Sequence, residues 1–136
     1  MKTFLLAVTL FGLWTLASAQ TAPMACDGHM ATVRLSEIKA GGNVDGFMKA
    51  VAAHKAWFES HGVKGDQIFS ARVIVRDEKT KARVYSDKQF MTFHIHGSTA
   101  PTPPHDAAYD AFVKLYNENS EIKESHDICM PNQPAK

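Results

Sequence analysis

The stretch FMTFHIH, residues 90–96, decides the fold class because apolar side chains at every second position alternate with mainly polar ones. Successive side chains of a strand point to opposite faces of a sheet. One face therefore carries Met91, Phe93 and Ile95, and the other carries Phe90, Thr92, His94 and His96. We expect this strand to run from Val84 to His96, with a kink around residues 86–88.

Outward from this strand, two more segments alternate in the same way. Residues 68–76 (IFSARVIVR) are rich in β-branched side chains and precede a polar turn at 77–81. Residues 31–38 place Val33 and Leu35 opposite Thr32, Arg34 and Ser36. Both patterns predict strands of period two. A short last strand is expected at 124–130.

Two segments show the apolar spacing of amphipathic helices. The first spans 44–61, with Asn43 as its N-cap and Gly62 after its last turn. The second spans 105–119 and follows a proline-rich loop at 97–104. The resulting order, β-α-β-β-α-β, predicts an α+β, ferredoxin-like fold: a four-stranded antiparallel sheet with two helices on one face.

The two cysteines, Cys26 and Cys129, lie at opposite ends of this domain. In the ferredoxin-like topology the first and last strands are antiparallel neighbours, so the start of one meets the end of the other. An isolated cysteine pair in an exported chain usually forms a disulfide. We therefore predict a Cys26–Cys129 bond.

Residues 1–19 have the pattern of a secretory signal peptide. Lys2 precedes an apolar run from Phe4 to Leu16, and Ala17-Ser18-Ala19 offers small residues for cleavage. The remainder, residues 20–136, is expected to form a single domain that is secreted or periplasmic. It has as many basic as acidic side chains. This balance argues against nucleic acid and, after signal cleavage, against membrane as a partner.

The two sheet faces differ in character, and we expect the helices to cover the more apolar one, with Val33, Leu35, Met91, Phe93 and Ile95 in the core. The opposite face, with its mixture of polar and apolar side chains, is then free to pack on a second copy. Such a homodimer encloses a lined cavity between sheet and helices or between the two sheets.

Element order and the helix FMKAVAAHKAWF at 47–58, closed by His61-Gly62, resemble the dimeric α+β barrel superfamily. That superfamily includes antibiotic-biosynthesis-monooxygenase-like and stress-response domains. The resemblance implies a homodimer of ferredoxin-like protomers. Its members include cofactor-free oxygenases, haem-binding enzymes, isomerases and domains without known activity, and no catalytic residue of the superfamily is matched here.

Histidines are the first candidates for a site. His94 and His96 share one strand face and could reach one metal, with a third ligand from His29, His105 or His126. The simpler interpretation is two partly exposed histidines, so the sequence predicts neither a metal nor another cofactor. His54 and His61 flank Trp57 and Phe58 and could contact a haem or an aromatic ligand, although core packing and the helix dipole explain them more simply.

Arg34 and Arg72 could bind a carboxylate or phosphate from the mixed sheet face, beside Phe90. Pairing with Glu37 or Asp77, or plain solvation, is the simpler interpretation of these arginines. The sequence thus predicts a small dimeric domain that binds a small apolar or aromatic ligand or a partner protein. The alternative is a cofactor-free or haem-dependent oxygenase or isomerase, with His94, His96 or Arg72 orienting the substrate.

Overall fold

The computed structural model describes residues 25–97 and 101–132, and the predicted signal peptide lies outside them. The elements follow the predicted order. They are β1 (His29–Ile38), α1 (Val44–Ser60), β2 (Gln67–Arg76), β3 (Arg83–Ile95), α2 (Ala107–Asn119) and β4 (Ser120–Met130).

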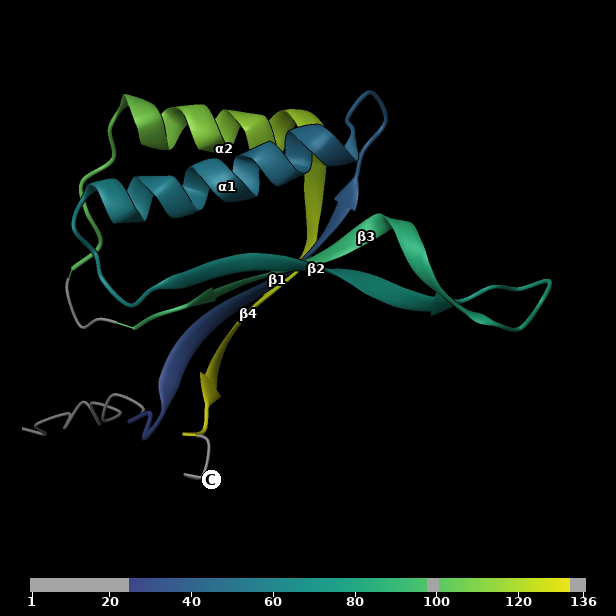
Figure 1. Cartoon of the computed structure of the whole chain (residues 1–136), viewed down its shortest axis with the longest axis horizontal. Coiled ribbons are helices and arrows are strands. Elements are labelled where there is room, and N and C mark those ends of the chain that lie inside the picture. The colour runs from purple at the N-terminus through teal and green to yellow at the C-terminus, as the bar shows by residue number, and fades with distance from the viewer. Residues whose placement is uncertain (1–24, 98–100, 133–136) are drawn as a thin grey trace, which may run out of the picture.

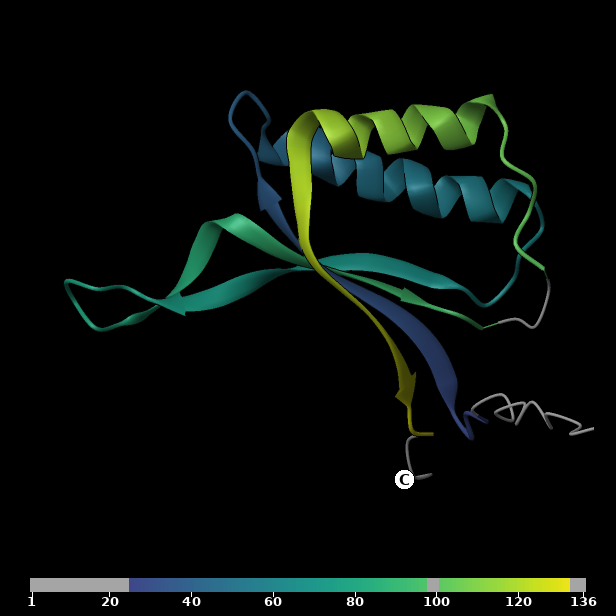
Figure 2. The same ribbon diagram turned by 180° about the vertical axis from the view of Figure 1, so that it is seen from behind.

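The four strands form one antiparallel sheet in the order β2-β3-β1-β4. Both helices lie on the same side of this sheet, and no helix covers its other side among the described residues (Figures 1 and 2). The predicted α+β ferredoxin-like fold is therefore confirmed. Its register pairs Thr32 with His94 and Arg34 with Thr92 across β1 and β3.

The kink expected in the third strand is present. Arg72 pairs with Phe90 and Ile74 pairs with Tyr85, so the residues between Tyr85 and Phe90 form a bulge. Ser86 fixes the bulge because its hydroxyl accepts hydrogen bonds from the backbone N–H groups of two residues that follow it. Beyond the bulge, the β2–β3 hairpin projects away from the helices (Figure 1).

Side-chain caps set where the helices begin. The side chain of Asn43 accepts the N–H of Gly46 at 2.8 Å, as an N-cap does. Asp106 accepts the N–H of Tyr109 at 2.8 Å, so α2 begins at Ala107 and not at His105. Because β4 starts directly after α2 and pairs from Ile38 onward, it is longer than the predicted segment 124–130.

The predicted disulfide is confirmed. Cys26 and Cys129 are bonded, with their Cα atoms 5.6 Å apart. Met30 of β1 pairs with Cys129 of β4, so strand pairing brings the two cysteines together. The bond closes a loop of 103 residues and stabilises the fold by up to about 4–5 kcal/mol in the chain-entropy description.

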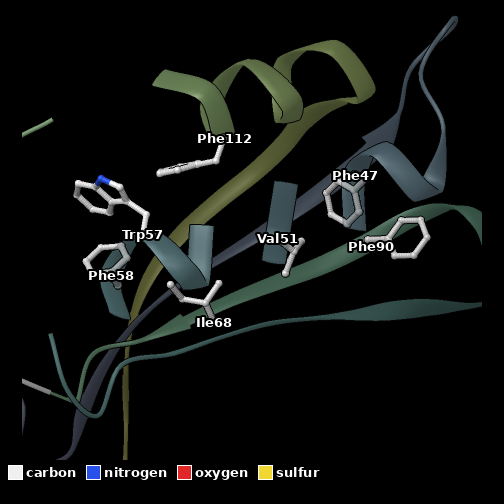
Figure 3. Close-up of a cluster of buried hydrophobic side chains, with 7 residues drawn as sticks. All are labelled: Phe47, Val51, Trp57, Phe58, Ile68, Phe90 and Phe112. Carbon is white, nitrogen blue, oxygen red and sulfur yellow. The ribbon is translucent and has the colours of Figure 1, made fainter. Parts of the chain in front are cut away.

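The core lies between the helices and the sheet (Figure 3). It consists of Phe47, Val51, Trp57, Phe58, Ile68, Phe90 and Phe112. Five of these seven side chains come from the helices, so the sheet contributes only Ile68 and Phe90. The helices thus cover the face that carries Phe90, and the predicted face assignment is wrong.

The physical reason is that the hand of the chain crossover selects the covered face. A connection from one strand through a helix to a parallel strand of the same sheet is right-handed. The handedness of this connection therefore decides which face the helices cover, even where the strand residues on the other face are more apolar. The large helical side chains then supply most of the core volume. Polar strand residues such as Arg34 and Thr92 can face the helices because a cavity lies there.

The face that the helices leave open is the more apolar one. Alternation and register place there Ala31, Val33, Leu35, Phe69, Ala71, Val73, Met91, Phe93 and Ile95. Phe69 is 42% exposed, and its ring stacks on that of Phe93 with centroids 5.0 Å apart. An apolar face of this kind is typical of an interaction surface.

Candidate functional site

A cavity of about 540 Å³ lies between the helices and the sheet. Ligand cavities in proteins commonly have roughly 300–1,000 Å³. The floor is formed by β1, β3 and the residue directly after β3, through Thr32, Arg34, Ser36, Thr92, His94 and His96. The roof is formed by α1 and α2, and the 102–105 loop and the start of β4 form part of its rim.

The roof is aromatic. It carries His54, Trp57, Phe58, Tyr109, Phe112 and Tyr116. The indole N–H of Trp57 donates to Asp106 Oδ1 at 2.8 Å, which ties the end of α1 to the N-cap of α2. His61 reinforces this link, with its Nε2 3.3 Å from Asp106 Oδ2. The Trp57 ring is therefore held in place by polar contacts to Asp106, which does not line the cavity.

His54 is the polar centre of this roof. Its ring stacks on Phe112 with centroids 4.7 Å apart, and its Nδ1 lies 3.5 Å from the Tyr116 hydroxyl. Burial, and secondly the nearby His94 and Arg34, lower the pKa of His54 to about 4. Burial also raises the pKa of Tyr116. Both side chains are thus neutral near pH 7 and offer polar atoms without charge.

Opposite His54, two histidines and a buried carboxylate meet at one end of the sheet. His94 Nε2 lies 2.8 Å from Asp66 Oδ2, and His96 Nδ1 lies 3.9 Å from the same oxygen. The other oxygen, Asp66 Oδ1, accepts the N–H of Gly97 at 3.0 Å. Burial lowers the pKa of His94, and the hydrogen bond to Asp66 opposes that shift.

Arg34 is the only lysine or arginine among the described residues that line the cavity. Its guanidinium makes no ion pair or hydrogen bond with any residue in the described part of the chain. Thr92 Oγ1 beside it is buried and also lacks a hydrogen-bond partner there. At the rim, Glu121 is paired with Lys123 at 2.7 Å. Among the described residues, the floor therefore has a cation without an anionic partner and, beside it, a buried hydroxyl without a hydrogen-bond partner.

The structure brings some of the predicted site residues together and separates others. Arg34, His94 and His96 all line the cavity. Phe90 lies in the core cluster instead. Arg72 is exposed, donates to Asp87 Oδ1 at 2.9 Å and lies over the ring of Tyr85, outside the cavity.

Of the three histidines considered as a third metal ligand, none joins His94 and His96. His105 stacks on Tyr109 at the cavity rim, and His29 and His126 are exposed. The acidic partner is Asp66, which sequence reasoning missed. The strand register is what places Asp66 there. Gln67 pairs with Ile95, so Asp66, directly before Gln67, lies beside the end of β3.

Compared with known proteins, the chain matches no family model, no curated protein and no solved structure. Its function is therefore argued from the cavity itself.

Proposed function

We propose that this protein binds a small aromatic molecule with an anionic group, such as an aromatic carboxylate, in the cavity between helices and sheet. The observation that carries the proposal is the guanidinium of Arg34, which no described residue pairs with, beneath a roof of aromatic rings. A half-buried cation without a partner is unfavourable, and a bound anion supplies that partner.

The aromatic roof favours a flat apolar body for the ligand. Rings pack well in stacked or edge-to-face geometries with centroids roughly 4.5–7 Å apart. The roof already contains such pairs, for example Trp57 and Tyr109 at 5.2 Å. A ligand ring can add to this set while its anionic group reaches the floor.

The polar atoms of the site suit the anionic end of such a ligand. Arg34 offers a planar fork of N–H donors that matches a carboxylate. Thr92 Oγ1, on the neighbouring strand, is buried without a hydrogen-bond partner among the described residues, and rotation of its side chain would let it bond to the ligand. His54, neutral because of its low pKa, adds a donor or acceptor without adding charge.

The setting we propose is an exported homodimer. The Cys26–Cys129 disulfide suits an oxidising compartment, and no helix in the described ranges is long and apolar enough to cross a membrane. For the dimer we propose that a second copy covers the helix-free sheet face. This assembly corresponds to the dimeric α+β barrel that the sequence resembles.

Size and apolar character argue for a second copy on that face. Four strands about 4.8 Å apart and about ten residues long present roughly 600 Å² in projection. Each partner of a stable interface contributes about 800 Å². The nine apolar side chains lie on β1, β2 and β3, whereas Glu124 and His126 lie on the same face at the β4 edge, so a two-fold axis through the apolar part keeps the charged edges of two copies apart.

The alternative function, a cofactor-free enzyme, is favoured by one observation. His94 lines the cavity and its Nε2 is held by the carboxylate of Asp66 at 2.8 Å. A histidine oriented by a carboxylate is a common general base. In this alternative, the free ring nitrogen of His94 takes a proton from the bound molecule, and His94→Ala abolishes turnover while the fold persists.

Trp57 allows a direct binding test, because residues 20–136 contain no other tryptophan and Trp57 lines the cavity. Benzoate, phenylacetate and 3-phenylpropanoate, whose phenyl rings do not emit in the tryptophan range, are titrated against the mature protein while tryptophan fluorescence is recorded. We expect saturable quenching by at least one of these acids, and a much weaker response to its neutral alcohol analogue.

The matched variants are Arg34→Gln and Arg72→Gln. Loss of a charge-assisted hydrogen bond is worth about 1.5–3 kcal/mol, so Arg34→Gln weakens binding of the acid by roughly 10- to 100-fold. Arg72→Gln leaves the affinity unchanged, because that side chain lies outside the cavity. Absence of saturable binding by all three acids, or equal weakening by both variants, overturns the proposal.

A further inference from the structure

We propose that Asp66, His94 and His96 form a binding site for a divalent transition-metal cation such as Zn²⁺. The three side chains come from two places in the fold. His94 and His96 are two residues apart near the end of β3, and Asp66 directly precedes β2. One ligand atom from each lies within 4.8 Å of the other two.

The spacing of these atoms is close to what a tetrahedral cation requires. Zn²⁺ binds histidine nitrogens and carboxylate oxygens at roughly 2.0–2.2 Å, which places neighbouring ligand atoms about 3.4 Å apart. The observed separations to Asp66 Oδ2 are 2.8 Å from His94 Nε2 and 3.9 Å from His96 Nδ1. Adjustments of the order of 1 Å in side-chain position therefore form the site.

The carboxylate is prepared for a cation by its surroundings. The side chain of Asp66 is only 4% exposed, and the only partners it has among the described residues are histidine rings and one N–H. A buried carboxylate is unfavourable unless a positive charge lies beside it. A bound cation provides that charge, while the N–H of Gly97 keeps Asp66 Oδ1 oriented from outside the site.

The donor set and its access define the class of metal. Two imidazoles and one carboxylate suit Zn²⁺ and, with open positions, Fe²⁺. His94 and His96 both line the cavity, so a further coordination position faces the space where we propose that the aromatic acid binds. Three protein ligands with one open position is the arrangement of zinc sites that also bind a small molecule.

Metal binding and the general-base alternative exclude each other. Both use the Nε2 atom of His94 and the carboxylate of Asp66, which are hydrogen-bonded in the metal-free protein. A cation between them replaces that hydrogen bond. The proposed metal ligands do not include Arg34, on which binding of the aromatic acid depends, so the two proposals can be tested separately.

The experiment is a calorimetric titration of Zn²⁺ into the mature protein after treatment with a chelator. Visible absorption after addition of Co²⁺ reports the coordination geometry. We expect one Zn²⁺ per chain and Co²⁺ bands of a four-coordinate site with nitrogen and oxygen ligands. His96→Ala is the main variant, because this side chain is 39% exposed and lies outside the core cluster.

Asp66→Asn is the second variant, since an amide oxygen can still accept the N–H of Gly97 while the charge is lost. Each variant should weaken Zn²⁺ binding by at least about 100-fold, because loss of an outer partner alone costs 10- to 100-fold. His126→Ala is the matched control: this exposed histidine also lies near a carboxylate, that of Glu124 at 3.4 Å.

The proposal is overturned if the wild-type protein binds no Zn²⁺, or if His126→Ala weakens binding as much as His96→Ala does. The quenching of Trp57 by aromatic acids is measured in the same metal-free samples. Asp66→Asn, whose side chain does not line the cavity, should leave that quenching intact, so the failure of one proposal is distinguishable from the failure of the other.

Discussion

His54 should make the stability of this protein depend on pH between pH 7 and pH 5. The ring is buried in the roof of the cavity, where only 7% of the residue is exposed. Its pKa is lowered from 6.5 to about 4, chiefly because burial disfavours the charged form. The unfolded chain therefore takes up a proton at a higher pH than the native protein does.

The sign and size of the effect follow from this difference. The contribution is fully present above pH 6.5 and is lost as the pH falls from 6.5 to about 4, because the unfolded state binds the extra proton. The full difference corresponds to about 3 kcal/mol of unfolding free energy. Between pH 7 and pH 5 we expect a loss of about 2 kcal/mol from His54 alone.

The assay is urea denaturation of the disulfide-bonded protein at several values between pH 7 and pH 5. This range lies above the pKa values of Asp77, Asp106 and Glu121, which their hydrogen bonds lower further. His94 adds to the loss in the same direction, because burial also lowers its pKa.

The variant His54→Gln removes the titrating ring and keeps a neutral polar side chain near Tyr116. It should lose most of the pH dependence, whatever its own stability at pH 7. His126→Gln, a change on an exposed strand position, should keep the wild-type dependence. A wild-type unfolding free energy that is constant from pH 7 to pH 5, or a His54→Gln variant with the wild-type slope, refutes the reasoning.

Three further predictions concern the disulfide, the core and the open face. Replacing both Cys26 and Cys129 by serine should lower the unfolding free energy by up to about 4–5 kcal/mol, and an unchanged urea midpoint contradicts this. Phe112→Ala should cost about 3–5 kcal/mol, because this 4%-exposed ring packs on His54 and Trp57; Phe112→Leu should recover most of the stability. Phe93→Lys should convert the proposed dimer into a monomer in sedimentation velocity, and a wild-type monomer at all concentrations contradicts the proposed interface.

The parts of the fold that depend on local signals could be predicted from the sequence. Alternation at 90–96 identified a strand, and Asn43 identified where α1 begins. The disulfide followed from topology, because the outer ends of the first and last strands must meet. Each of these inferences needs only neighbouring residues or the order of the elements.

The face of the sheet and the make-up of the site could not be predicted in this way. Hydropathy correctly identified the more apolar face of the sheet. The right-handed connection nevertheless places the helices on the mixed face, where large helical rings such as Trp57 complete the core. Asp66 joins His94 only through the pairing of β2 with β3. His54 enters the same cavity from α1, a placement that depends on how the helix packs.

The most direct test of the central claim is to map the binding position of an aromatic acid by NMR. Amide, indole and imidazole resonances of the isotope-labelled mature protein are followed as 2-naphthoate is added. If the acid binds in the cavity, the largest shifts fall on the Trp57 indole, the His54 ring and the backbone around Arg34 and Thr92. Shifts confined to the helix-free face around Phe69 and Phe93, or no saturable shifts at all, would contradict it.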